Sequence, residues 1–123
     1  MLTGSCNCQA VTFEVKKALR SSACHCGQCR KQSGHHWASG LAYDADVIIR
    51  GEVKWFASSD FAKRGFCPTC GCFLFWKMES EDKISFSLGT IDGATGLKLD
   101  RHIFTADKGD YYDIADGVPQ REN

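Results

Sequence analysis

Eight cysteines in a chain of 123 residues fall into three short clusters, and this grouping limits the possible fold more than any other feature of the sequence. The clusters are Cys6-Asn7-Cys8, the segment from Cys24 to Cys29, and the segment from Cys67 to Cys72. In a reducing compartment, clustered cysteines are more often metal ligands or redox groups than disulfide partners. The first residues contain neither a basic nor an apolar segment, so we expect no secretory signal and a cytoplasmic protein.

The third cluster, Cys67-Pro68-Thr69-Cys70-Gly71, has the form of a zinc knuckle. Two residues between the thiolates let a tight turn direct both sulfurs at one ion, with Zn–S distances of about 2.3 Å. Pro68 sets the φ angle of the turn, and Gly71 permits the positive φ that turns backbone N–H groups toward the sulfurs. Because one knuckle supplies only two ligands, a four-coordinate site needs a second pair.

Cys6 and Cys8 can supply that pair, since residues i and i+2 of an extended chain point to the same side. One alternative is that these two cysteines form an N-terminal redox dithiol. A thioredoxin-like role for Cys67 and Cys70 is less favoured, because no βαβ pattern surrounds them. The spacing therefore predicts a structural zinc held by Cys6, Cys8, Cys67 and Cys70.

The middle cluster places three thiols, those of Cys24, Cys26 and Cys29, within six residues. Structural zinc is usually closed by four protein ligands, whereas catalytic zinc keeps three and an open position. Three thiolates on a zinc dication carry a net charge of about −1 and can accept a soft ligand such as a substrate thiolate. In the alternative interpretation, both zincs are structural and the site is closed by Cys72 or by one of His25, His35 and His36. An iron–sulfur cluster is less favoured, because no cysteine run with ferredoxin spacing is present.

Short segments with alternating, β-branched or aromatic residues predict strands. They are residues 11–15, 47–50, 53–56, 73–76, 84–88 and 97–104. Arg50-Gly51-Glu52 predicts a tight hairpin turn between two of them. Helical periodicity is weak, with a short helix expected only after Cys26 or within 89–96. We expect one domain over residues 1–123 that is mainly antiparallel β, with metal-bearing loops and few short helices.

The charge balance limits the partners of the protein. Fifteen basic and fifteen acidic residues give a formal net charge of +0. A neutral chain exerts no long-range attraction on nucleic acid or on anionic membranes. No segment approaches the roughly 18 uninterrupted apolar residues of a membrane span. We therefore expect neither nucleic acid nor a membrane as a partner.

Four segments together resemble the glutathione-dependent formaldehyde-activating enzyme family, which includes centromere protein V. They are Gly4 to Val11, Cys24 to Lys31, the stretch from Ser58 to Gly71, and the closing pair His102-Ile103-Phe104 with Asp116 to Pro119. The resemblance implies a β-tent fold of small antiparallel sheets. It also implies a structural zinc on Cys6, Cys8, Cys67 and Cys70 and a second zinc on Cys24, Cys26 and Cys29. The chain departs from the family in its short length and in Cys72.

The named activity of that family joins formaldehyde to glutathione as S-hydroxymethylglutathione, which is a carbon–sulfur lyase reaction run in reverse. We therefore predict a zinc-dependent carbon–sulfur lyase in which Cys24, Cys26 and Cys29 form the catalytic centre and the partner is a small glutathione-like thiol. Arg30 and Arg64 are the predicted substrate-binding residues, because cations orient the carboxylates of such a thiol. The alternative is a non-enzymatic, zinc-stabilised binding module.

Further residues near the clusters have predicted roles in the site. His25, His35 and His36 are candidates for proton transfer near neutral pH. Phe66, Trp37 and Trp76 are candidates for the walls of a pocket, although aromatic residues of a small β protein usually belong to the core.

Overall fold

The computed structural model describes all 123 residues and confirms the prediction of a mainly β protein. A three-stranded antiparallel sheet has the order β1-β2-β5, and its strands are Leu2–Ser5, Thr12–Val15 and Val47–Arg50. A seven-stranded sheet has the order β10-β3-β4-β9-β8-β7-β6. In chain order its strands are Arg20–Cys24 (β3), Trp37–Tyr43 (β4), Lys54–Ala57 (β6), Ala62–Phe66 (β7), Phe73–Met78 (β8), Lys83–Ser87 (β9) and His102–Ile103 (β10). All pairings are antiparallel except that of β10 with β3, which is parallel.

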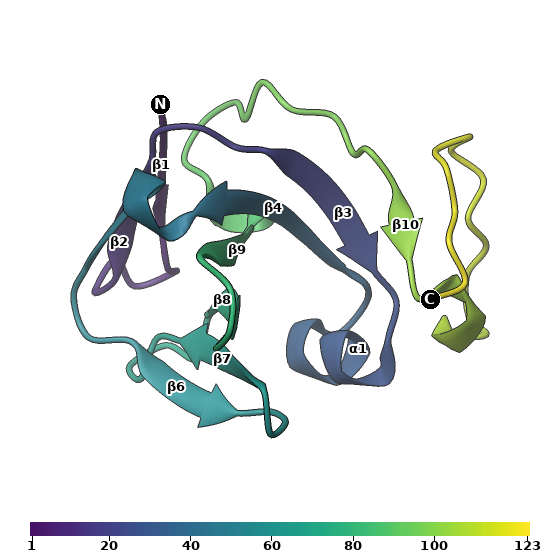
Figure 1. Cartoon of the computed structure of the whole chain (residues 1–123), viewed down its shortest axis with the longest axis horizontal. Helices are drawn as coiled ribbons and strands as arrows, with labels where there is room; N and C mark the ends of the chain where they lie inside the picture. Colours follow the sequence, from purple (N-terminus) through teal and green to yellow (C-terminus); the bar gives the residue numbers. More distant parts are fainter.

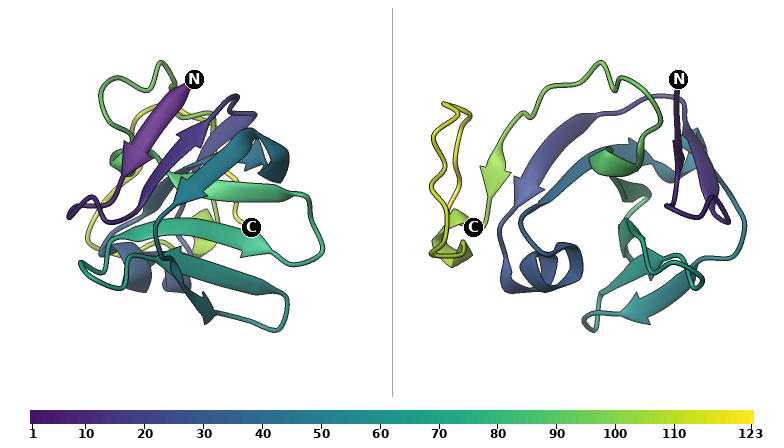
Figure 2. Two further views of the ribbon diagram at one scale, coloured as in Figure 1. Left: turned by 90° about the vertical axis from the view of Figure 1, so that its left-hand side faces the viewer. Right: turned by 180° about the vertical axis from the view of Figure 1, so that it is seen from behind.

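The larger sheet is strongly curved, and the remaining elements lie beside it (Figure 1). The single α-helix, α1 (Gly27–Ser33), lies near the ends of β3 and β4. The segment that follows β10 has little regular structure and forms one end of the molecule, as the view from behind also shows (Figure 2). No helix is long and apolar enough to cross a membrane.

The main core fills the space between the two sheets. Phe13 of β2 packs edge-on against Phe75 of β8, with ring centroids 5.1 Å apart, and it also contacts Phe86 of β9. All three rings are almost completely buried, and burial of each contributes about 1.5–3 kcal/mol to folding. Cys6 and Cys67 belong to the same buried cluster. The core that joins the sheets therefore includes two of the predicted metal ligands.

Five of the six predicted strands are confirmed, and the sixth is wrong over most of its length. Within residues 97–104 only His102 and Ile103 form a strand. The segment before them is held to β3 by side chains instead of a backbone ladder. The Ser21 hydroxyl donates to the carbonyl oxygen of Lys98 at 2.7 Å, and the Ser21 N–H donates to the Asp100 carboxylate at 2.8 Å.

The predicted hairpin at Arg50-Gly51-Glu52 is also wrong. The strand before it, β5, pairs with β2 in the small sheet, whereas the strand after it, β6, pairs with β7 in the large sheet. The chain crosses from one sheet to the other at Gly51, which has a φ of 94°. A Cβ atom at this position would collide with the carbonyl oxygen of Ala10, so the crossing requires glycine.

Four strands escaped prediction because their composition is unlike that of typical strands. They are β1, β3, β4 and β7, and they contain Gly, Ser, Ala, Cys, Lys and Arg in place of a β-branched alternation. Their backbones are extended because neighbouring strands supply hydrogen-bond partners, on both sides for β3, β4 and β7 and on one side for β1, which is an edge strand.

We expect Gly40→Ala to destabilise the fold. Gly40 lies in β4 directly beneath the ring of Phe86, and an added Cβ atom would overlap that ring. Because Phe86 is fully buried, it cannot move aside, and overpacking of this kind costs about 1–3 kcal/mol. Urea unfolding of the protein measures the change. Gly89→Ala is the matched control, since a Cβ atom there meets open space, and equal unfolding midpoints for the two variants would contradict the prediction.

Candidate functional site

The first cysteine cluster brings together the four thiols that the spacing predicted. The sulfurs of Cys6, Cys8, Cys67 and Cys70 all lie within 4.8 Å of one another. The Cys8 sulfur is 3.7 Å from those of Cys6 and Cys67. Tetrahedral zinc with Zn–S bonds of about 2.3 Å holds its sulfurs roughly 3.8 Å apart, whereas a disulfide needs about 2.05 Å. The arrangement fits a metal ion with four thiolate ligands.

Backbone N–H groups donate hydrogen bonds to sulfurs of this cluster. The Cys70 N–H donates to the Cys67 sulfur at 3.5 Å, and the Val11 N–H donates to the Cys6 sulfur at 3.3 Å. The hydrogen bond from Cys70 lowers the pKa of Cys67. Gly71 has a φ of 75°, as predicted from the knuckle. A backbone hydrogen bond from Cys72 likewise lowers the pKa of Cys70, so the knuckle favours the thiolate form of both its cysteines, whereas the pKa of Cys8 is raised.

Cys72 lies beside this cluster but is not one of its four converging thiols. Its sulfur is directed at the carbonyl oxygen of Phe73, 3.9 Å away, and burial raises its pKa. Cys72 is therefore a half-buried neutral thiol, and it does not join the second cluster either.

The second cluster consists of Cys24, Cys26 and Cys29, whose sulfurs also lie within 4.8 Å of one another. Cys24 ends β3, Cys26 is the N-cap of α1, and Cys29 lies in the first turn of that helix. The Cys26 sulfur accepts a hydrogen bond from the Cys29 N–H at 3.4 Å, which begins the helix. The neighbouring thiols of Cys24 and Cys29 lower the pKa of Cys26. No histidine, carboxylate or further cysteine lies close enough to be a fourth ligand.

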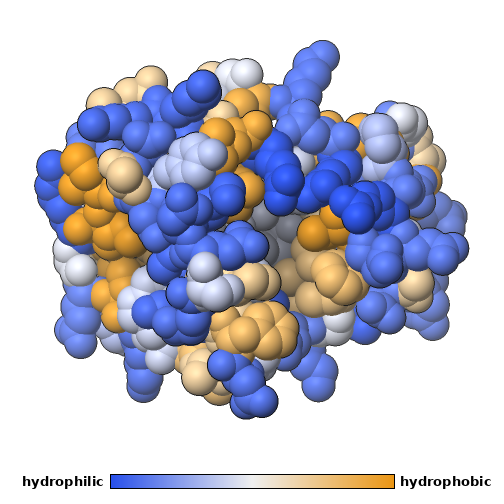
Figure 3. Space-filling model, viewed as in Figure 1, coloured by the Kyte–Doolittle hydropathy of each residue, from blue (hydrophilic) through white to orange (hydrophobic).

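The three thiols of the second cluster open onto a cavity of about 430 Å³. Its walls come from α1, from the concave side of the large sheet and from residues 101–104. Figure 3 shows a hollow in the middle of the face seen in Figure 1, with apolar side chains beside it. Trp37 and Trp76 line the cavity as predicted, whereas Phe66 does not. A three-thiol centre with no fourth ligand therefore faces a space large enough for a small organic molecule.

Arg64 is the cation nearest to the three thiols. Its guanidinium donates to the Cys29 sulfur at 3.6 Å and to the side-chain oxygen of Gln28 at 3.3 Å. Only 4% of Arg64 is exposed, yet it lines the cavity. Its Nε is buried and has no hydrogen-bond partner. Unsatisfied buried donors are uncommon in folded proteins and often mark functional sites.

Arg30, the second predicted substrate-binding residue, does not line the cavity. It lies on α1, and its positive charge acts on Tyr112, in the C-terminal segment. Its contact with substrate remains a prediction.

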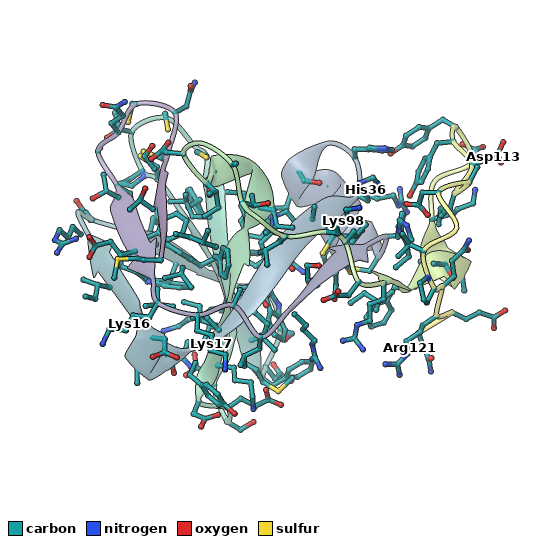
Figure 4. All side chains as sticks on the ribbon, turned by 90° about the horizontal axis from the view of Figure 1, so that it is seen from above. Lys16, Lys17, His36, Lys98, Asp113 and Arg121 are labelled. Atoms are coloured by element: carbon teal, nitrogen blue, oxygen red, sulfur yellow. The ribbon has the colours of Figure 1, made fainter.

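All four histidines lie between the loop that carries Cys24 and Cys26 and the C-terminal segment, and none of them lines the cavity. The Tyr112 hydroxyl is hydrogen-bonded to Nδ1 of His25, and Nε2 of His25 is 2.8 Å from Nδ1 of His102. Nε2 of His102 is 2.8 Å from the Asp116 carboxylate. Figure 4 shows His36 on the side of α1 that faces the segment carrying Asp113.

One assignment of protons satisfies this whole chain of hydrogen bonds. Tyr112 donates to His25, His25 donates to His102, and His102 donates to the Asp116 carboxylate. Burial lowers the pKa of His25 to about 4, so its ring is neutral at physiological pH. The hydrogen bond from His102 lowers the pKa of Asp116. The network anchors the loop that carries Cys24 and Cys26 to the C-terminal segment.

The sequence did not predict that these residues form one hydrogen-bonded network. His102 and Asp116 appeared only as parts of the family's closing signature, and Tyr112 gave no signal at all. The sequence contains four histidines, but it does not reveal that they lie together. Their association depends on contacts between residues that are separated by 77 and by 87 positions in the chain.

We expect His102→Ala to destabilise the protein by about 1–3 kcal/mol, because the buried Nε2–H of His25 would lose its acceptor. Limited proteolysis should then cut the segment after residue 104 faster than in the unaltered chain. Asp113→Ala is the control, since Asp113 lies in the same segment but is exposed and makes no side-chain hydrogen bond to the histidines. Equal protection of both variants would show that the network does not anchor the segment.

A matched pair of cysteine variants tests the first cluster. We expect Cys70→Ser to lose one bound zinc per chain, because Cys70 is one of the four converging thiols. Cys72→Ser, the same replacement two residues away, should keep its full zinc content. Native mass spectrometry counts the metal in each variant. A loss of zinc in the Cys72 variant alone would overturn this division of the ligands.

The fold and the two clusters define a class: small two-sheet β proteins with two cysteine centres able to hold metal ions. The chain belongs to the glutathione-dependent formaldehyde-activating enzyme family, whose model matches residues 1–107. It is 30% identical over 115 residues to an uncharacterized lyase of Schizosaccharomyces pombe, a match that covers 91% of this chain and 84% of that protein. A crystal structure of a Rhodobacter sphaeroides protein has a similar fold, with a TM-score of 0.65 and 24% identity over 76% of this chain and 91% of that one.

Proposed function

We propose that the protein is a zinc-dependent carbon–sulfur lyase acting on a thiol–aldehyde adduct such as S-hydroxymethylglutathione. The observation that carries the proposal is the three-thiol cluster with no fourth ligand, open to a cavity. Membership of the formaldehyde-activating family and the lyase named in fission yeast support this reaction class. Eight free cysteines suit a reducing cytoplasm.

The proposal assigns different roles to the two clusters. Cys6, Cys8, Cys67 and Cys70 would hold a closed structural zinc, and Cys24, Cys26 and Cys29 would hold a zinc with one open position. Zinc bound in the open centre supplies a Lewis acid that stabilises a substrate sulfur as thiolate.

Arg64 is the proposed substrate-binding arginine, because it lines the cavity beside the thiols and Arg30 does not. Its positive charge offsets the net charge of about −1 that three thiolates leave on a zinc dication.

In the lyase direction, the carbon–sulfur bond breaks as the hydroxyl carbon becomes a carbonyl. The hydroxyl proton is released and the sulfur gains a proton, so the products are a thiol and formaldehyde. In this proposal the Arg64 guanidinium stabilises negative charge on the reacting oxygen.

The apolar walls contribute by excluding water. Trp37 lies over Phe73 with ring centroids 4.4 Å apart, and its indole N–H donates to Ser87 at 2.6 Å. These contacts hold Trp37 rigidly next to the cluster. A partly dry centre strengthens the interactions of Arg64 and slows competing hydration of the aldehyde.

Exchange spectroscopy tests the proposal directly. With formaldehyde and glutathione present, the zinc-loaded protein should accelerate adduct exchange in NMR, and Cys26→Ser should lose at least about 100-fold of that acceleration, as expected when a principal stabilising group is removed. Cys72→Ser is the matched control and should retain the activity.

Two outcomes would contradict the proposal. No acceleration over the uncatalysed background, with a second thiol also tried, would favour the zinc-stabilised binding module. Acceleration that survives Cys26→Ser would remove the three-thiol centre from the mechanism.

A further inference from the structure

Two arginines without acidic partners line the end of the cavity away from the thiols. Arg20 and Arg101 both belong to its wall, and neither makes a salt bridge. Arg101 uses only its Nε, which donates to the Ser22 hydroxyl at 3.2 Å, so both terminal nitrogens are free. The nearest carboxylate in sequence, that of Asp100, accepts the backbone N–H of Ser21 through one oxygen and makes no salt bridge with Arg101.

The register of the sheet fixes how far these arginines lie from the thiols. Arg20, Ser22 and Cys24 alternate along β3 and therefore point to the same side, into the cavity. The parallel pairing of His102 with Ala23 places Arg101 beside Ser22. At about 3.3 Å per residue, the level of Ser22 is roughly 7 Å from Cys24 and that of Arg20 roughly 13 Å.

Between the thiols and the arginines, the cavity lining includes serine hydroxyl groups that make no hydrogen bond within the protein. Ser39 of β4 lies opposite Ser22, and Ser85 of β9 lies opposite Leu41. Both serines line the cavity, and neither hydroxyl has a partner within the protein. Glu81 is the one acidic residue in the lining, whereas Arg20 and Arg101 lie in the far half and Arg64 lies beside the thiols. The far half of the cavity therefore presents two arginines and two free hydroxyls among apolar side chains such as Leu41, which lies opposite Arg20.

The positive charges of Arg20 and Arg101 lie close to each other without an acidic partner, and this repulsion is unfavourable. Partial burial and the charges of Arg20 and Arg121 lower the pKa of Arg101, and the negative charge of Asp100 offsets this only in part. A bound anion would relieve this repulsion, and the planar guanidinium of arginine offers two parallel N–H donors that match a carboxylate. Perturbed, unpaired charges in a cavity are characteristic of ligand sites.

We propose that Arg101, assisted by Arg20, forms a carboxylate subsite that selects thiols bearing an anionic group about 7 Å or more from the sulfur. The subsite rests on the proposed function, because the three-thiol centre receives the sulfur. It adds a length and charge requirement: a short anionic thiol or a long neutral thiol fills only half of the cavity.

Three thiols separate length from charge in a binding experiment on the zinc-loaded chain. The long carboxylate 6-mercaptohexanoate satisfies both requirements, 6-mercaptohexanol has the length without the charge, and thioglycolate has the charge without the length. Quenching of the fluorescence of Trp37 and Trp76, which line the cavity, reports binding without any turnover. We expect 6-mercaptohexanoate to bind at least about tenfold more tightly than either of the others, as a charge-assisted hydrogen bond would give.

Variants assign this preference to the arginines. Arg101→Gln should abolish the tenfold preference and leave the affinity for 6-mercaptohexanol unchanged. Arg20→Gln, at an exposed position where loss of folding is not expected, should reduce the preference about two- to fivefold. Arg50→Gln is the control, because Arg50 is exposed in β5 of the other sheet and pairs with Glu14.

The outcomes distinguish the subsite from the function on which it rests. Equal binding of 6-mercaptohexanoate and 6-mercaptohexanol to the unaltered protein would overturn the subsite and leave the thiol centre intact. Equal weakening of both thiols by Arg101→Gln would reduce Arg101 to a structural role. Failure of all three thiols to bind would overturn the thiol centre itself and the subsite with it.

Discussion

The convergence of four thiols at the junction of the two sheets is the constraint on which the rest of the structure depends. Cys6 and Cys8 follow β1 of the small sheet, whereas Cys67 and Cys70 lie between β7 and β8 of the large one. A metal ion bound there would join residues 59 positions apart at the edge of the phenylalanine core. With β7 and β8 fixed in this way, Arg64 and Trp76 are presented to the cavity.

The second centre differs from the first in what surrounds it. The first cluster lies against the core and is completed by four cysteines, while the second has three and borders a cavity. Buried Arg64 lies beside the thiols, Trp37 lines the cavity next to them, and unpaired arginines lie farther along β3 and just before β10. In the proposed function, the thiol end of the cavity binds the substrate sulfur and the arginine end binds its carboxylate. Such a polarity suits an extended molecule with a thiol at one end and a carboxylate at the other.

The ligand sets could be predicted because their spacing is local. Cys6 and Cys8 converge through a tight turn, closed by the hydrogen bond from the Gln9 N–H to the Cys6 carbonyl oxygen, instead of the extended chain that was predicted. Cys26 and Cys29 are one helical turn apart, so in both pairs the local chain brings the two sulfurs together. Predicted strands were correct where β-branched and aromatic residues alternate. The predicted strand over residues 97–104 was wrong, because side-chain hydrogen bonds hold most of that segment to β3 in place of a backbone ladder. The predicted hairpin was wrong because the chain changes sheets at Gly51.

The sequence by itself determined the mainly β structure, the grouping of seven cysteines into two clusters able to hold a metal ion, and membership of a family through motifs in the correct order. Only the tertiary structure decided which cations face the thiols and what anchors their loop. Arg64 meets Cys29 across 35 residues, His25 meets His102 across 77, and Arg101 meets Ser22 across 79. Contacts at such separations depend on sheet order and curvature, because no local periodicity encodes which distant strands become neighbours.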